Sequence, residues 1–131
     1  MEETEAAQKK VKAAQAIADE ARVDLSLDDF DRISRTTPQL CDLRPFGKYV
    51  MTDLDAIGGV SVLFRELIDG GHMDADVPTI TGRKLGENVA DTTFPEGQDV
   101  VHRANDALMP EGGIVVLRGT LAPEGAVMKT A

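Results

Sequence analysis

The clearest hydrophobic pattern in the chain lies between Lys48 and Gly71. Within this stretch, apolar side chains recur at intervals of three and four residues, as on one side of an amphipathic helix. These positions are Val60, Leu63, Phe64, Leu67 and Ile68. Gly70-Gly71 should end the helix, because glycine readily takes a positive φ just past a helix end. The pattern therefore predicts a helix that begins near Val60 and packs one side against a core.

The polar residues of the same stretch complete the prediction. Arg65, Glu66 and Asp69 are interpreted as the solvent-facing side of the helix. A shorter helical turn is expected before it, capped by Thr52, with Gly58-Gly59 allowing the backbone to bend between the two pieces. None of these side chains is a good catalyst in this setting, so the stretch is interpreted as a packing unit.

Two further helices are predicted in the N-terminal part of the chain. Met1–Arg22 is rich in Ala, Glu, Gln and Lys, but its apolar stripe is mostly alanine. Alanine buries little surface, so the first two turns are expected to fray and Met1–Ala14 to contribute little to folding. Ser26 should cap the next helix, with Asp29 at its third position and Pro38 just beyond its end. Its predicted inner face consists of Leu27, Phe30 and Ile33.

The C-terminal half predicts shorter elements. Val77–Thr81 is interpreted as a β segment, followed by a short helix at Arg83–Ala90 capped by Thr81. Asp91–Pro110 contains prolines, glycine and scattered charges, which indicate a long surface connection. Two strands, Gly113–Leu121 and Ala126–Thr130, should then flank a turn at Ala122–Gly125, which has Pro at its second position and Gly at its fourth. The predicted fold class is α+β.

Composition narrows the possible functions. A chain of 131 residues with 42% hydrophobic and 28% charged residues has the size and make-up of one globular domain. A net charge of −9 argues against nucleic acid and against anionic membranes, which both select basic surfaces. No apolar run approaches the roughly 20 residues of a membrane span. The single cysteine, Cys41, excludes an internal disulfide and is typical of a reducing cytoplasm.

The candidate chemical groups are few, and no catalytic, cofactor-binding or metal-binding residue is assigned. Cys41 is interpreted as structural, because one thiol cannot hold an iron–sulfur cluster that needs several. His72, Asp74 and Asp76 alternate along a loop and could share a face, but they lack the further oxygens of a calcium loop. His102 and Ser61, the latter on the central helix, are not interpreted as functional either. The acids Asp28, Asp29 and Asp31 lie at a helix start, where the helix macrodipole favours negative charge.

Three separated segments carry a family resemblance. They are CDLRPFGKYVMTDLDAIGGV (Cys41–Val60), DADVPTITGRKLGENVAD (Asp74–Asp91) and GGIVVLRGTLAPEGAVMKTA (Gly112–Ala131). In order and spacing they resemble the middle of the dihydroxy-acid dehydratases, which form one iron–sulfur hydro-lyase family with the phosphogluconate and sugar-acid dehydratases. The resemblance runs from about Ala16 to Ala131. It departs at Met1–Ala14, where charged and alanine-rich residues replace the glycine- and serine-containing segment of the family.

The resemblance implies that the chain is a fragment, since the family enzymes are several times longer. Residues 1–91 would be the helical end of the N-terminal α/β domain, 92–110 a connecting segment, and 111–131 the first hairpin of a C-terminal β-barrel domain. The family removes water from 2,3-dihydroxy acids with an iron–sulfur cluster and Mg²⁺, and it is homo-oligomeric. The cysteine, magnesium and base motifs lie outside this stretch, so the resemblance implies a fragment that is inactive alone. Within the family, the chain is more similar to the enzymes of branched-chain amino-acid synthesis than to the phosphogluconate enzymes.

Two alternatives remain open at this point: a non-catalytic interaction module derived from the same family, and a piece of a sugar-acid or phosphogluconate dehydratase. The hairpin at 111–131 bears on the first alternative. Ile114–Leu117 is apolar at successive positions and would therefore present apolar side chains on both faces of a strand. A lone hairpin is marginally stable and its edges can pair with another chain. We therefore expect self-association, or docking on a partner, through this hairpin.

Overall fold

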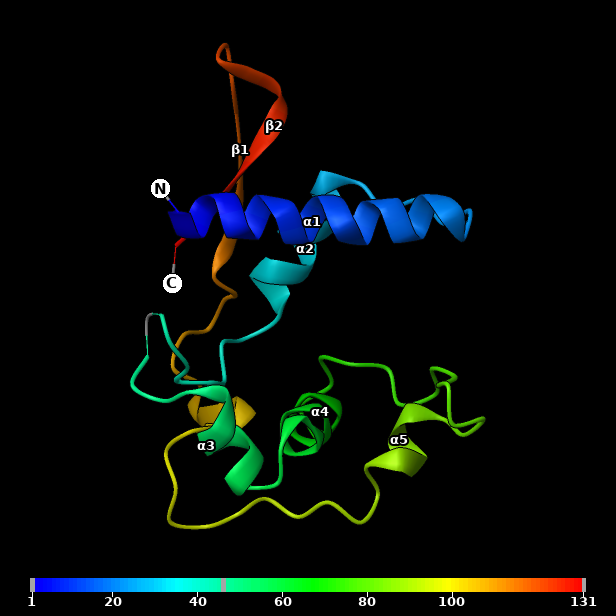
Figure 1. Ribbon diagram of the computed structural model, residues 1–131, viewed down its shortest axis with the longest axis vertical. Helices are drawn as coiled ribbons and strands as arrows, with labels where there is room; N and C mark the ends of the chain where they lie inside the picture. Colours follow the sequence, from blue (N-terminus) through cyan, green and yellow to red (C-terminus); the bar gives the residue numbers. More distant parts are fainter. Residues whose placement is uncertain (1, 46, 131) are drawn as a thin grey trace. The chain divides into compact units, whose positions relative to one another are not determined.

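The computed structural model describes residues 2–45 and 47–130. Within them the chain forms helices and one antiparallel hairpin, which confirms an α+β composition (Figure 1). Two compact units are present, one made of the residues up to Thr37 together with those from Glu111, the other of Pro38–Pro110. The predicted division at residues 91 and 110 concerns a longer protein and stays a prediction. The elements are α1 (Glu2–Glu20), α2 (Leu27–Thr36), α3 (Met51–Ala56), α4 (Val60–Asp69), α5 (Leu85–Asn88), the 3₁₀ turn η1 (Ala104–Asp106), β1 (Ile114–Gly119) and β2 (Ala122–Lys129).

In the first unit, α1 packs on β2 and α2 packs on β1. Ala7 and Val11 of α1 are buried together with Val127 of β2, and Leu27, Phe30 and Ile114 pack around them. The expectation that the first two turns of α1 fray is therefore wrong for the described residues, because the helix begins at Glu2 and Ala7 is already buried. A thin alanine stripe suffices here because β2 packs directly against it.

The cap of α2 is as predicted. The Ser26 backbone N–H and hydroxyl both donate to the Asp29 carboxylate, at 3.0 and 2.7 Å, and the Asp29 backbone N–H donates back to the Ser26 hydroxyl. These hydrogen bonds, with a smaller contribution from Arg32, lower the pKa of Asp29 to about 2. Leu27 and Phe30 face the core as predicted, whereas Ile33 is exposed, which corrects the third member of that face.

The hairpin closes through a shorter turn than the sequence predicts. Gly119 pairs with Ala122, so Thr120 and Leu121 form a two-residue loop, and the predicted turn at Ala122–Gly125 lies inside β2 instead. The Ala122–Gly125 segment produces a register shift, since three residues of β2 lie opposite one residue of β1 between the Gly119 and Leu117 pairs. Gly125, at φ 103°, allows that irregular backbone.

The second unit has its own core, in which residues from distant parts of the chain meet. Val100 and Val101 belong to it, so Asp91–Pro110 is more than the predicted surface connection. Isolated bridges from Gln39 to Met109 and from Cys41 to Val101 place this segment beside the one that follows Pro38. The buried members of the core are Leu40, Leu54, Val62, Leu67, Val100 and Val101.

Helices α3 and α4 confirm the predicted order of a short helical turn, a glycine bend and a second helix, with a different cap on α3. Both Gly58 and Gly59 have positive φ, at 115° and 71°, and separate the two helices as expected. Helix α3 begins one residue before Thr52, and Asp53 rather than Thr52 caps it, accepting the Val50 backbone N–H at 2.8 Å. The helix N-terminus thus uses a carboxylate three residues in from its cap position.

The segment at Val77–Thr81 is not a full strand. Only an isolated bridge between Pro78 and Lys84 is present, and α5 starts at Leu85, with Glu87 accepting the Lys84 backbone N–H. Thr81 therefore does not cap that helix. Its hydroxyl instead contacts the Thr79 hydroxyl at 2.8 Å and donates to the Asn88 side chain at 3.0 Å. The loop is closed by its own polar side chains.

Candidate functional site

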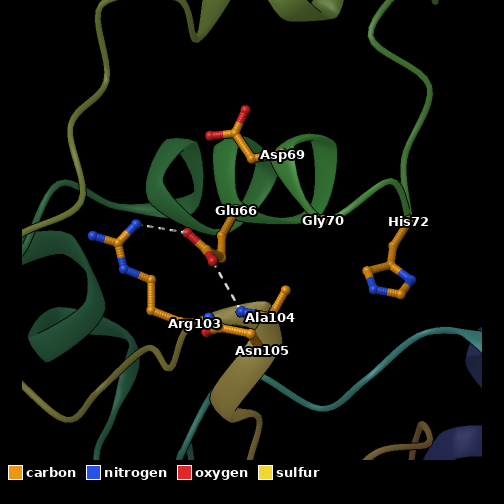
Figure 2. Close-up of a pocket in the computed structure, with 7 residues that line it drawn as sticks. All are labelled: Glu66, Asp69, Gly70, His72, Arg103, Ala104 and Asn105. Atoms are coloured by element: carbon orange, nitrogen blue, oxygen red, sulfur yellow. Dashed lines mark hydrogen bonds and ion pairs between the residues drawn. The ribbon is translucent and has the colours of Figure 1, made fainter.

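The most unusual side chain of the second unit is Glu66, a carboxylate that is only 7% exposed. It lies four residues after Val62 and one before Leu67, and these three residues are the buried positions of α4. The interpretation that Glu66 faces solvent is therefore wrong. The buried side of the helix is rotated from the predicted stripe, so that Val60 is exposed and Glu66 points to the interior (Figure 2).

The Glu66 carboxylate joins α4 to the segment that leads into η1. Its Oε1 accepts the Ala104 backbone N–H at 2.9 Å, and its Oε2 lies 3.4 Å from Nη1 of Arg103. A buried carboxylate is stable only when it is paired and hydrogen-bonded in this way. Glu66 therefore fixes the start of η1 on the side of α4.

Arg103 is itself held from three sides. Its guanidinium lies 3.8 Å from the centre of the Phe94 ring, and its Nη2 is 3.3 Å from Oε1 of Glu96. A guanidinium over an aromatic face gains cation–π attraction. With Glu66 as its buried partner, Arg103 is neutralised and oriented by its neighbours, so it is poorly placed to bind a free anion.

A groove of about 510 Å³ opens beside the ion pair between Glu66 and Arg103. Figure 2 shows the His72 ring on the opposite side of the groove from Arg103, and Asp69 directed away from Glu66. Asp69 is paired with Arg65 at 2.8 Å on its own helix. Since both oxygens of Glu66 are engaged, the described residues place no base beside a nucleophile in this groove. The lining residues are Glu66, Asp69, Gly70, His72, Arg103, Ala104 and Asn105.

The groups singled out from the sequence are dispersed in the structure. His72 lines the groove, while Asp74 accepts the Asp76 backbone N–H and Asp76 pairs with Lys84 at 2.6 Å. The predicted alternation therefore does not bring three ligands together. His102 donates its backbone N–H to the Leu40 carbonyl at 2.8 Å.

The remaining candidates have structural roles. Cys41 is half-buried against the core, and burial raises the pKa of its thiol. Asp28 pairs with Arg118, and Asp31 accepts from Arg35, which with the Val116 backbone N–H lowers the pKa of Asp31. Ser61 is exposed on α4. Across residues 2–45 and 47–130, no three His, Cys, Asp or Glu side chains gather as a metal site would require.

The sequence analysis missed the buried pairing of Glu66 with Arg103. The available signal was the position of Glu66 on α4, four residues after Val62 and beside Leu67. Its partner lies 37 residues further along the chain, a separation that no local pattern covers.

None of the described helices is both long and apolar enough to cross a membrane.

Comparison with known proteins shows the family of this chain. The family model described as "Dihydroxy-acid/6-phosphogluconate dehydratase N-terminal" matches residues 10–88, more than half of the chain. The chain belongs to the dihydroxy-acid/6-phosphogluconate dehydratase family. It is similar to curated dihydroxy-acid dehydratases, with 49% identity over 117 residues to that of Acidothermus cellulolyticus and 52% over 114 residues to that of Roseiflexus sp..

A third relative, dihydroxy-acid dehydratase 1 of Nocardia farcinica, is 52% identical over 117 residues. These matches cover 87–88% of this chain but only 20–21% of each relative. The chain therefore spans about a fifth of the length of the curated relatives that it matches. Glu66 lies within the residues that the family model matches, whereas Arg103 lies beyond them.

The described residues do not fit the iron–sulfur cluster or the Mg²⁺ that the family resemblance implies. Cluster iron is held by several thiolates, whereas Cys41 is the one cysteine and its raised pKa favours the neutral thiol. Mg²⁺ binds through several oxygen ligands, whereas no three His, Cys, Asp or Glu side chains gather among the residues that the structure describes.

Proposed function

We propose that this chain is a structural, non-catalytic portion of a dihydroxy-acid dehydratase. Such an enzyme removes water from 2,3-dihydroxy acids and forms 2-keto acids, here in branched-chain amino-acid biosynthesis in the cytoplasm. The observation that carries the proposal is the identity of about 50% to dihydroxy-acid dehydratases over most of the chain. The single half-buried cysteine agrees with a reducing compartment.

The internal chemistry of the two units supports a scaffold role. The buried carboxylate Glu66 is committed to Arg103 and to a backbone N–H, and the acids of α2 are committed to caps and ion pairs. Polar groups whose hydrogen bonds are all made within the protein stabilise the local structure, but they have no donor or acceptor left for a substrate. We infer that the cluster and Mg²⁺ are held by other parts of the longer enzyme.

The hairpin supports a further element of the proposal. One face of the β1–β2 sheet is covered by α1 and α2, while Val115, Leu117 and Met128 lie on the other face. An apolar strand with one uncovered face is typical of a sheet that continues into a larger structure. We propose that this hairpin begins the C-terminal barrel domain that the resemblance implies.

A segment exchange tests the proposal. The matched segment of the Roseiflexus sp. enzyme is replaced by this chain, and 2-keto acid release from 2,3-dihydroxyisovalerate is measured after iron, sulfide and Mg²⁺ have been supplied. We expect the exchanged enzyme to retain turnover, because about half of the segment is identical and no cluster ligand is assigned to it. A soluble, folded, cluster-loaded exchange enzyme without activity would contradict the scaffold role.

The chain alone provides the matched control. Treated in the same way, it should release no more product than a sample without protein. Turnover above that level, abolished by Cys41→Ser, would show that Cys41 supports chemistry and would overturn the non-catalytic interpretation.

A further inference from the structure

The hydrogen-bonding edges of the hairpin are occupied by side chains of the two neighbouring helices. In an antiparallel pair, residues directly opposite each other either exchange hydrogen bonds or point their N–H and C=O groups outward. Val116 and Val127 are opposite each other, and both direct backbone groups outward to helices. The outer edge of each strand therefore lies beside a helix rather than beside water alone.

Helix α2 covers the edge of β1. Oδ1 of Asp31 accepts the Val116 backbone N–H at 3.2 Å, and the Ser34 hydroxyl accepts the Ile114 backbone N–H at 3.3 Å. The Ser34 carbonyl also accepts the Gly112 backbone N–H at 2.6 Å. Three successive outward donors, at every second residue, are thus bonded to two consecutive turns of one helix.

Helix α1 and the bulge cover the edge of β2. The Gln8 side-chain amide donates to the Val127 carbonyl at 3.3 Å. Nearer the tip, Pro123 has no backbone N–H to offer, and Nη1 of Arg118 donates to the Glu124 carbonyl at 3.3 Å. The register shift between Leu117 and Gly119 also breaks the regular ladder that a new strand would need.

We propose that Asp31, Ser34 and Gln8 act as edge guards that prevent a strand of a second copy from adding to this hairpin. Exposed strand edges are templates for pairing with another chain. The occupant that they exclude is the hairpin of another copy, because its apolar run Val115-Val116-Leu117 combines high β-propensity with an absence of charge. This proposal concerns the 131-residue chain by itself. In the longer enzyme proposed above, strands of the barrel domain would replace these side chains at the hairpin edges.

The test compares variants of the full 131-residue chain. Asp31→Ala with Ser34→Ala removes both side-chain acceptors at the β1 edge, and Asp31→Asn keeps an acceptor oxygen while it removes the charge that pairs with Arg35. Arg32→Ala is the matched control, because Arg32 lies on the same helix and forms its ion pair with Asp29 inside that helix. Sedimentation, thioflavin T fluorescence and the far-ultraviolet circular dichroism of each variant are followed together.

We expect the double variant to show a several-fold rise in sedimenting, thioflavin-positive material with its helical signal retained, and Asp31→Asn and Arg32→Ala to behave like the original chain. A folded double variant that does not assemble would overturn the proposal. So would equal assembly by Asp31→Asn or Arg32→Ala, since that would indicate lost charge or lost stability. If the double variant loses its helical signal, the single variant Ser34→Ala replaces it in the same measurements. The proposal then expects increased assembly together with faster amide exchange at Ile114.

Discussion

Glu66 shows how one buried charge can organise a unit with a small core. It lies on the buried side of α4, among residues such as Val62 and Leu67. An apolar residue there would fill the same space, but it could not accept the Ala104 N–H or pair with Arg103. The carboxylate therefore determines where the η1 segment sits on α4, which hydrophobic contact alone leaves less specified.

Replacing Glu66 should reveal this role directly. Glu66→Ala leaves a buried backbone N–H and a guanidinium without their acceptor, and we expect a loss of about 2–4 kcal/mol in the free energy of unfolding. Glu66→Gln should lose less, because its amide oxygen can still accept the Ala104 N–H. Urea unfolding followed by circular dichroism measures both.

The matched control for Glu66 is Glu96→Ala. Glu96 contacts the same guanidinium, but its side chain is 86% exposed, so the loss should be at most about 1 kcal/mol. Equal losses at the two positions would mean that Arg103, rather than the buried carboxylate, controls the unit.

The sequence could not place Glu66, for a physical reason. Helical periodicity assigns a side by hydrophobicity, so a glutamate is assigned to solvent whatever its partner. The capping residues of α2 were predicted correctly because Ser26 and Asp29 are three residues apart and their interaction is local. Glu66 and Arg103 are 37 residues apart, so their pairing depends on the fold that brings them together. The cap of α2 was therefore predictable from the sequence, whereas this pair was not.

At the scale of elements, α1 is more deeply integrated than its alanine-rich sequence indicates. Val11 is 3% exposed and Ala7 is buried beside it against Val127, whereas the larger Ile17 is 70% exposed. The apolar stripe of α1 is narrow, but β2 packs closely enough to bury it. Propensity and side-chain volume describe a helix in isolation, whereas the contribution of this helix depends on which strand packs against it.

A pair of substitutions in α1 tests this view. Val11→Ala should lower the free energy of unfolding by about 1–2 kcal/mol, because it removes buried methyl groups and leaves a small cavity. Ile17→Ala removes a larger side chain from an exposed position and should change it by less than about 0.5 kcal/mol. Thermal unfolding of both variants measures the two changes in stability. Equal effects, or none at Val11, would restore the expectation that this helix contributes little.

The hairpin turn shows the limit of local turn signals. Ala122–Gly125 has the residues of a good turn, yet the chain reverses two residues earlier, at Thr120 and Leu121. Proline and glycine also suit a bulge, where a ladder N–H is not needed and a positive φ is tolerated. The choice between the two depends on which residues pair across the strands, and that pairing places Val127, opposite Val116, in the core.

At the scale of the whole molecule, the described chain forms two cores rather than one. The first joins the N-terminal helices to the C-terminal hairpin, and the second lies within Pro38–Pro110. The order of helices and the hairpin were predictable from periodicity. The pairing of the chain's two ends in one unit was not, because neither end carries a local signal for the other.

The last prediction concerns the uncovered face of the hairpin. Leu117 is 48% exposed and Met128 is 37% exposed, and both lie on the face opposite α1 and α2 together with Val115. Apolar surface of this kind favours contact with a second copy, while the net charge of −9 opposes it. Because salt screens the charge over about 10 Å at 0.1 M, self-association should strengthen as salt is added.

Sedimentation at increasing protein and salt concentrations measures this balance. Leu117→Thr should weaken association, because it removes apolar surface from the face while introducing a β-branched side chain suited to a strand. Leu121→Thr is the matched control, since Leu121 is fully exposed in the two-residue turn, beyond the paired residues. A chain that stays monomeric at all salt concentrations, with slow amide exchange at Val115 and Leu117, would contradict the prediction. Because the edge guards block strand addition, the association expected here is a finite face-to-face contact, distinguishable from the thioflavin-positive assembly of the edge variants.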